Sequence, residues 1–173
     1  KRLKKKNFSK ISLPKFDKSL DNRLPKKKWT KINQKPDLII FEGWCVGAKS
    51  QSDKELKQPI NKLEREEDSN FKWRKTVNEK LKKNYQKVFK MINLLIFLKV
   101  PSFKYVLKWR MLQEQKLKFK SKGKKVMNKN EIKKFIMFYE RITKSMIKKL
   151  TKSANIVIKL DPKHKLNSLK INK

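Results

Sequence analysis

The segment from Asp37 to Ala48 constrains the fold of this 173-residue chain more than any other. It reads Asp-Leu-Ile-Ile-Phe-Glu-Gly-Trp-Cys-Val-Gly-Ala, so an apolar run ends abruptly in Glu-Gly-Trp-Cys. The run has no polar alternation and is rich in residues that favour a pleated surface, which predicts a fully buried strand. Glu42 would then lie at the carboxyl edge of a sheet, where open parallel sheets bind ligands. The segment therefore indicates an α/β enzyme.

The charge of the chain allows a different interpretation. It has 50 Lys and Arg against 15 Asp and Glu, a formal net charge of +35, which favours contact with polyanions such as nucleic acid. Only 6 of these basic residues are Arg, the side chain on which nucleic-acid readers usually rely. The excess of Lys favours a biased composition, which adds non-specific binding at low salt, over a basic nucleic-acid-binding module.

Other residue counts exclude several classes of protein. Cys45 is the only cysteine, which excludes a disulfide framework and a Cys-based metal site and suits a reducing compartment, the cytoplasm or an organelle. His164 is the only histidine, so a His-based metal site and a Ser-His-Asp triad have little support. No apolar run approaches the ~20 residues of a membrane span. The chain begins without Met and without an apolar signal core, so we expect that it is cut from a longer protein.

The hydrophobic pattern along the chain is strand, helix, strand, two helices, strand. Buried strands are expected at 38–42, 94–98 and 156–160, and helices over 74–92, from Pro101 onward, and along an apolar stripe from 132 to 150 that Asn128 and Glu131 cap. The remaining segments are a basic, irregular start (1–36), a long connection with an acidic cluster (43–73), a polar stretch (118–129) and a basic tail (161–173). Helical crossovers between buried strands predict a parallel sheet with helices on its faces.

The candidate site residues each have two interpretations. Glu42 precedes a glycine and either orients a Mg²⁺-bound water or a substrate hydroxyl, or caps a local turn. Arg110 either clamps a phosphate by bidentate contact or forms an i,i+4 pair with Glu114 worth ~0.2–0.5 kcal/mol. The tryptophans, which could stack nucleic-acid bases, show no regular interleaving with Lys, and packing is the simpler role for them.

A set of segments, in a fixed order over residues 11–162, carries a resemblance to a known family. They are Leu-Pro-Lys-Phe-Asp-Lys-Ser with Asp-Asn-Arg (13–23), Phe-Glu-Gly-Trp-Cys-Val-Gly-Ala (41–48), Pro-Ile-Asn-Lys-Leu-Glu (59–64), Trp-Arg (73–74), Trp-Arg…Gln-Glu (109–114), Phe-Tyr-Glu-Arg (138–141) and Leu-Asp (160–161). Together they resemble the ATP-dependent D-glycerate 3-kinase-like proteins. That family belongs to the P-loop kinases, close to uridine kinase, pantothenate kinase and phosphoribulokinase.

The resemblance implies phosphoryl transfer from ATP to a small hydroxy acid, D-glycerate above all, with Mg²⁺. It implies catalytic roles for Glu42 and Arg110, with Glu42 also supporting Mg²⁺ through a water. The substrate-binding positions that it implies are Asp17, Lys18, Arg23, Trp44, Asn61 and Glu64. Those at the nucleotide and the lid are Arg110, Gln113 and Asp161. The expected partner is the small hydroxy acid, without a membrane or a specific nucleic acid.

The chain departs from this family in one respect. In the family a phosphate-binding loop precedes the Leu-Pro-x-Phe-Asp-Lys segment, and none of the three glycines here belongs to a G-x-x-x-x-G-K-[ST] loop. We therefore expect residues 1–162 to be the carboxyl-terminal portion of one kinase domain, followed by a basic tail at 163–173. The sheet would lack its first strand, which in the family lies between the first two strands expected here. Such a chain is predicted to fold poorly alone and not to turn over ATP, and a non-catalytic kinase remnant is the alternative.

Overall fold

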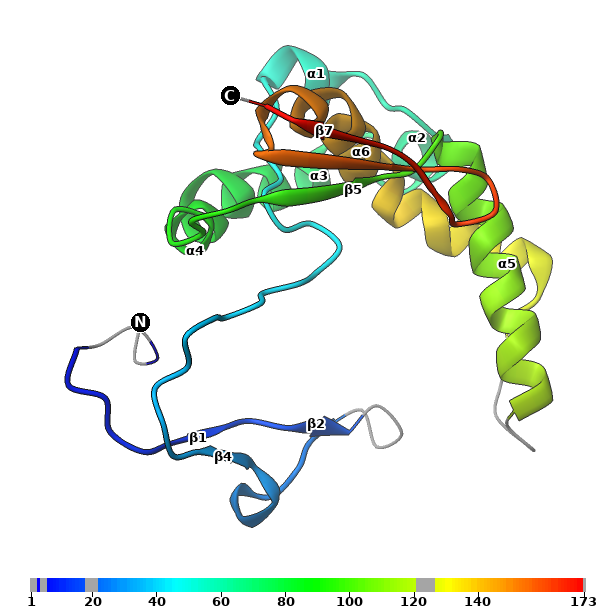
Figure 1. Ribbon diagram of the computed structural model, residues 1–173. Helices are drawn as coiled ribbons and strands as arrows, with labels where there is room; N and C mark the ends of the chain where they lie inside the picture. Colours follow the sequence, from blue (N-terminus) through cyan, green and yellow to red (C-terminus); the bar gives the residue numbers. More distant parts are fainter. Residues whose placement is uncertain (1–2, 4–5, 18–21, 121–126, 173) are drawn as a thin grey trace. The chain divides into compact units, whose positions relative to one another are not determined.

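The chain divides into two compact units, Lys1–Glu42 and Gly43–Lys173. The structure, a computed structural model, describes residues 3, 6–17, 22–120 and 127–172 (Figure 1).

The first unit contains two small antiparallel strand pairs. Strand β1 (Ile11–Leu13) pairs with β4 (Thr30–Ile32), and β2 (Phe16–Asp17) pairs with β3 (Asn22–Arg23). A short 3₁₀ turn, η2 (Lys26–Lys28), precedes Trp29, whose Nε1 donates a hydrogen bond to the Leu24 carbonyl at 2.7 Å. This segment was expected to be irregular, and it is instead organised around these two ladders.

The prediction of a strand at residues 38–42 is wrong. The segment has no regular secondary structure, and Leu38 and Ile40 are 75% and 81% exposed. A strand exists only where its backbone groups pair with a neighbour, and no strand among the described residues pairs with this one. The apolar run alone therefore did not decide its conformation.

The second unit contains a three-stranded mixed sheet. Strands β5 (Ile96–Lys99) and β6 (Ile156–Leu160) are parallel, and β7 (Leu166–Ile171) pairs antiparallel with β6. The parallel pair, with helices in the connection, confirms the predicted α/β class, and β6 has the predicted bounds. Strand β7 was not predicted, because it lies in the segment expected to be a basic tail.

Three predicted helical regions are confirmed. Helix α3 (Lys72–Lys80), the π-helical turn η3 (Leu81–Tyr85) and α4 (Gln86–Phe89) form the first, and α5 (Phe103–Lys120) is the second. The third, α6 (Lys129–Ser153), starts with the predicted capping box of Asn128 and Glu131. Between residues 43 and 73, where a long connection was expected, there are two further short helices, α1 (Asp53–Lys57) and α2 (Lys62–Glu66). Residues 121–126, within the stretch expected to be polar, lie outside the described part.

The core lies between α6 and one face of the sheet (Figure 1). Phe97 of β5 and Val157 of β6 pack there against Met146 and Leu150 of α6. Gly47 fits beside this core because its φ of +80° suits a glycine, and a Cβ there would lie 2.8 Å from a Leu95 methyl carbon.

The opposite face of the sheet is apolar but exposed. Side chains alternate along each strand, so the residues next to Phe97 and Val157 point away from α6. In register across the three strands these are two rows, Ile96–Ile156–Ile171 and Leu98–Ile158–Leu169. Four of these six side chains are about half exposed or more, and Ile171 is the most exposed of them at 69%. The sheet thus has a helical layer on one face within the described residues. None of the described helices is long and apolar enough to cross a membrane.

Candidate functional site

A cavity of about 760 Å³ lies where α5, α6 and β5 meet the turn that follows β6. Most of its lining is apolar or aromatic, and its polar groups include Arg110, Gln113, Lys116 and Thr143. A concave, mainly apolar pocket with a few polar groups is the usual form of a small-molecule site. Three of the predicted site residues line this one cavity, Arg110 and Gln113 from α5 and Trp44 from a distant part of the sequence.

Arg110 is held firmly within this cavity. Its Nη2 lies 2.6 Å from Oε1 of Glu114, and its Nη1 donates to Oε1 of Gln113 at 2.8 Å. The guanidinium carbon also lies 5.0 Å from the centre of the Phe135 ring on α6. The i,i+4 pair that the sequence offered is therefore formed. Nε of Arg110 is buried and has no hydrogen-bond partner among the described residues. The contacts above involve one N–H of each Nη, and a guanidinium has five N–H donors, so donor capacity remains for an anionic group.

Trp44 joins the turn after Gly43 to helix α6. Its Nε1 donates to Oγ1 of Thr143 at 2.9 Å, and its ring meets Tyr139 edge-on with centroids 4.7 Å apart. The neighbouring Cys45 packs against the core, and burial raises the pKa of its thiol above the ordinary value. The thiol therefore stays protonated near neutral pH, which argues against a nucleophilic role.

The turn after β6 contributes the other predicted nucleotide-side residue, Asp161. Its Oδ1 accepts hydrogen bonds from the backbone N–H groups of Lys163 and Lys165, both at 2.8 Å, and these bonds shape the turn. The turn brings His164 to 3.8 Å from the Trp109 ring of α5, centroid to centroid, and Trp109 Nε1 donates to the Pro162 carbonyl. Asp161 thus shapes the turn that forms one wall of the cavity.

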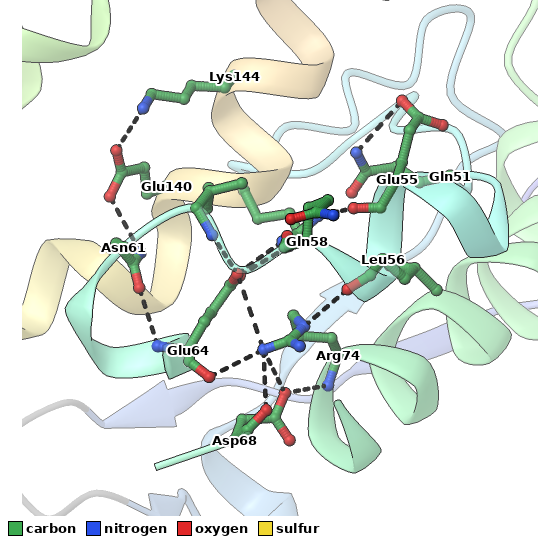
Figure 2. Close-up of polar contacts among 12 residues, drawn as sticks. Gln51, Glu55, Leu56, Gln58, Asn61, Glu64, Asp68, Arg74, Glu140 and Lys144 are labelled. Atoms are coloured by element: carbon green, nitrogen blue, oxygen red, sulfur yellow. Dashed lines mark hydrogen bonds and ion pairs between the residues drawn. The ribbon is translucent and has the colours of Figure 1, made fainter. Parts of the chain in front are cut away.

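Glu64 belongs to a buried ion-pair network (Figure 2). Arg141 donates to both of its carboxylate oxygens, from Nε at 2.7 Å and from Nη2 at 2.6 Å. Arg74 lies on the other side, with Nη1 3.3 Å from Oδ2 of Asp68 and 3.9 Å from Oε2 of Glu64. The two guanidinium groups also donate to the carbonyls of Glu55, Leu56, Gln58, Glu64 and Asp68. The network therefore fastens α1 and α2 to α3 and α6.

Asn61 lies at the edge of the same network. Its Oδ1 caps α2 through the Glu64 N–H, while its Nδ2 donates to Glu140 and to the Met137 carbonyl of α6, both at 3.0 Å. Sequence reasoning did not assign roles to Arg74, Arg141 or Glu140. The signal was present, because a cluster of carboxylates in so basic a chain needs buried cationic partners if it is to be enclosed.

The remaining predicted residues lie in the first unit. Asp17 and Arg23 belong to the β2–β3 pair, with Asp17 opposite Asn22, and Lys18 lies outside the described residues. Glu42 is exposed and ends the extended segment 38–42. The described residues contain no group of three or more His, Cys, Asp or Glu side chains that could hold a metal ion by themselves.

The sequence comparison found a relative among the curated proteins, an uncharacterized kinase named mug58 from Schizosaccharomyces pombe. It is 31% identical over 135 residues, which make up 75% of this chain and 47% of the relative. No family model matches the chain. Two solved structures share the fold. The D-glycerate 3-kinase from Cryptococcus neoformans var. grubii serotype A matches with a TM-score of 0.70 and 22% identity, covering 94% of this chain and 60% of that one. A protein named YGR205w matches with a TM-score of 0.65 and 20% identity, covering 96% and 59%.

The predicted resemblance to the glycerate 3-kinase-like family is confirmed. The α/β fold with a parallel strand pair and flanking helices is likewise that of a glycerate kinase neighbour. The chain spans about half the length of the curated relative and three fifths of the two solved structures. The family likeness therefore extends over most of this chain but over only part of each relative.

Proposed function

We propose that the complete protein transfers the γ-phosphoryl group of ATP to a small hydroxy acid, D-glycerate being the first candidate. The observation that carries this proposal is that Arg110 and Gln113 line one cavity with Trp44, and that these residues belong to two segments that resemble the kinase family. The names of the relatives, a kinase and a D-glycerate 3-kinase, support the same reaction class. The single thiol, Cys45, suits a reducing compartment, and we expect the protein in the cytoplasm or an organelle.

In this proposal Arg110 binds the phosphates and stabilises the charge that develops on the transferred group. Phosphoryl transfer depends mainly on positioning and on neutralising charge, so a fixed guanidinium is the kind of group that it requires. Gln113 holds Arg110 in place, and the turn shaped by Asp161 forms the nucleotide side of the cavity. The acceptor-binding roles that the resemblance implies for Trp44, Asn61, Glu64, Asp17, Lys18 and Arg23 are part of the same proposal.

Glu42 is proposed to support Mg²⁺ through a water and to orient the acceptor hydroxyl. Its exposed carboxylate fits a hard cation that keeps part of its water shell, and among the described residues it forms no ion pair. Bound Mg²⁺ would neutralise charge on the phosphates of ATP. The tasks of this chain's own residues are binding the phosphates, orienting the acceptor and excluding water.

Replacing Arg110 in the complete protein tests the proposal directly. We expect Arg110→Ala to lower kcat by tenfold or more, roughly 1.4 kcal/mol, because the guanidinium would act on charge that develops during transfer. The measurement is D-glycerate-dependent formation of ADP. An unchanged kcat would leave Arg110 with its helix-pair role alone, and ADP formation that does not depend on any small hydroxy acid would contradict the proposed acceptor.

We further propose that residues 1–173 alone do not turn over ATP, because the sequence contains no G-x-x-x-x-G-K-[ST] loop to hold the phosphates. Saturable ATP hydrolysis by the purified 173-residue chain would contradict this.

A further inference from the structure

Glu114 is the residue that ties Arg110 to the rest of the second unit. It lies on α5 one turn after Arg110, and only 5% of it is exposed. A carboxylate enclosed to this extent is stable only where charged or hydrogen-bonding partners surround it. The partners that surround Glu114 therefore show what it does.

The two oxygens of Glu114 have different partners. Oε1 lies 2.6 Å from Nη2 of Arg110, and Oε2 accepts the backbone N–H of Met127 at 3.3 Å. Met127 immediately precedes Asn128, the residue that caps α6. Glu114 thus links the guanidinium on α5 to the first residues of α6 through one buried carboxylate.

Moving Arg110 out of this pair costs considerable free energy. The buried Glu114 carboxylate would keep only one backbone N–H donor, and removing one partner of a buried ion pair is strongly destabilising. Gln113 and the Phe135 ring restrain the same guanidinium from two other directions. An arginine side chain has large rotamer freedom when it is unrestrained, so these contacts remove in advance the entropy that anion binding would otherwise cost.

We propose that Glu114 is a positioning residue, which holds the Arg110 guanidinium in the orientation that binds phosphate oxygens. The guanidinium N–H groups that Glu114 and Gln113 leave free are then available to the anion at a fixed place in the cavity. The inference rests on the proposed phosphate-binding role of Arg110. It goes beyond that role, because it attributes the orientation of the Arg110 guanidinium to Glu114, a residue that need not touch the ligand.

A double-mutant cycle tests the inference without requiring enzymatic turnover. The probe is inorganic tripolyphosphate, titrated calorimetrically at physiological ionic strength into the 173-residue chain and its variants Arg110→Ala, Glu114→Gln and the double variant. We expect each single variant to bind roughly tenfold more weakly than the unaltered chain and the double variant to bind no more weakly than Arg110→Ala. The many lysines bind the probe equally in all four proteins, so their contribution cancels.

Glu79→Gln is the matched control, because Glu79 also forms an i,i+4 pair, with Lys83 at 3.0 Å, and does not line the cavity. Its affinity for tripolyphosphate should equal that of the unaltered chain. Thermal unfolding separates positioning from stability, since Glu114→Gln is nearly isosteric and keeps an oxygen that can accept the Met127 N–H. Anion affinity that falls only in step with the unfolding temperature would make Glu114 a structural residue and overturn the inference.

Two other outcomes would also overturn it. Additive losses in the double variant would mean that Glu114 acts independently of Arg110. Tighter binding by Glu114→Gln would mean that the carboxylate competes with the anion for the guanidinium. The acceptor and the reaction are judged separately, by D-glycerate-dependent ADP formation in the complete protein, so the proposed kinase function can fail while this cycle succeeds.

Discussion

Arg141 illustrates how one buried side chain fixes several segments of this protein. It bridges α6 to α2 through the Glu64 carboxylate, and to the end of α1 through the carbonyls of Glu55 and Gln58. The side chains of Arg141 and Glu64 are both about nine-tenths buried, so water screens their attraction little. The stability of the second unit therefore depends on this buried ion pair.

We expect Arg141→Met to destabilise the second unit by about 3–5 kcal/mol, because it leaves Glu64 buried with Arg74 as its more distant cationic partner. Urea unfolding followed by circular dichroism measures this. Lys134→Met is the control, since Lys134 pairs with Glu67 of the same acidic cluster but both side chains are more than half exposed. Its cost should stay within about 1 kcal/mol. An equal loss of unfolding free energy in the two variants would contradict the argument that burial makes the Arg141–Glu64 pair important.

Gly47 is the residue where backbone geometry demands a particular amino acid. Gly47→Ala should cost about 1–2 kcal/mol for the left-handed conformation alone, and more if the Leu95 side chain cannot move away from the new methyl group. Gly43→Ala is the comparison, because Gly43 has an ordinary φ and its added Cβ would meet only Val46 at 3.1 Å. Unfolding temperatures of the two variants should differ clearly, and similar values would show that the turn relaxes.

At the scale of elements, helix α6 is the best-determined part of the chain. Its apolar stripe faces the core with Ile136, Met146 and Leu150, and the Asn128 and Glu131 side chains satisfy backbone N–H groups at its start. Helices α1 and α2 begin with similar caps, Ser52 with Glu55 and Asn61 with Glu64. These short-range signals were present at 52–55 and 61–64, but helices of five residues carry too little periodicity to be predicted from it.

Removing the cap of α6 gives an element-scale prediction. Asn128→Ala should destabilise the second unit by about 1 kcal/mol, because the N–H groups of Asn130 and Glu131 lose their acceptor. Asn130→Ala should have little effect, since Asn130 contributes only its backbone to the cap. Chemical denaturation with both variants checks this, and a larger loss for Asn130→Ala would contradict the assignment.

At the scale of the whole molecule, one face of the sheet in the second unit carries exposed apolar side chains. Parallel strands are usually covered on both faces, and large exposed apolar patches promote binding or association. The sequence indicates the same burial for two of the strands, since 94–98 and 156–160 are predicted to be buried. Expected burial and observed exposure therefore disagree at Ile96 and Leu98, and Leu169 and Ile171 of the unpredicted β7 extend the exposed face.

This face should bind the dye ANS while the chain is folded. We expect the double variant Ile96→Lys/Ile171→Lys to lose most of the dye fluorescence and to self-associate less, without a large change in unfolding temperature, because both side chains are half exposed or more. Val157→Lys serves as the contrasting variant, since Val157 is fully buried on the other face and its replacement should unfold the sheet. Dye binding that persists in the double variant would place the apolar surface elsewhere.

The sequence by itself determined the elements whose information is local: the cap and stripe of α6, the bounds of β6, and a helical run, which was predicted at 74–92 and lies at 72–89. It also indicated the family, because the shared segments keep their order along the chain. Residues 38–42 show the limit, since a strand needs a pairing partner that no local pattern supplies. Only the tertiary structure decided that Glu64 lies between two buried arginines, that the basic tail contains β7, and that the Arg110–Glu114 pair contacts Phe135 and the Met127 N–H. The contacts of Glu64 and of the Arg110–Glu114 pair join separate segments, and β7 exists only through its pairing with β6, so no single segment encodes these energies.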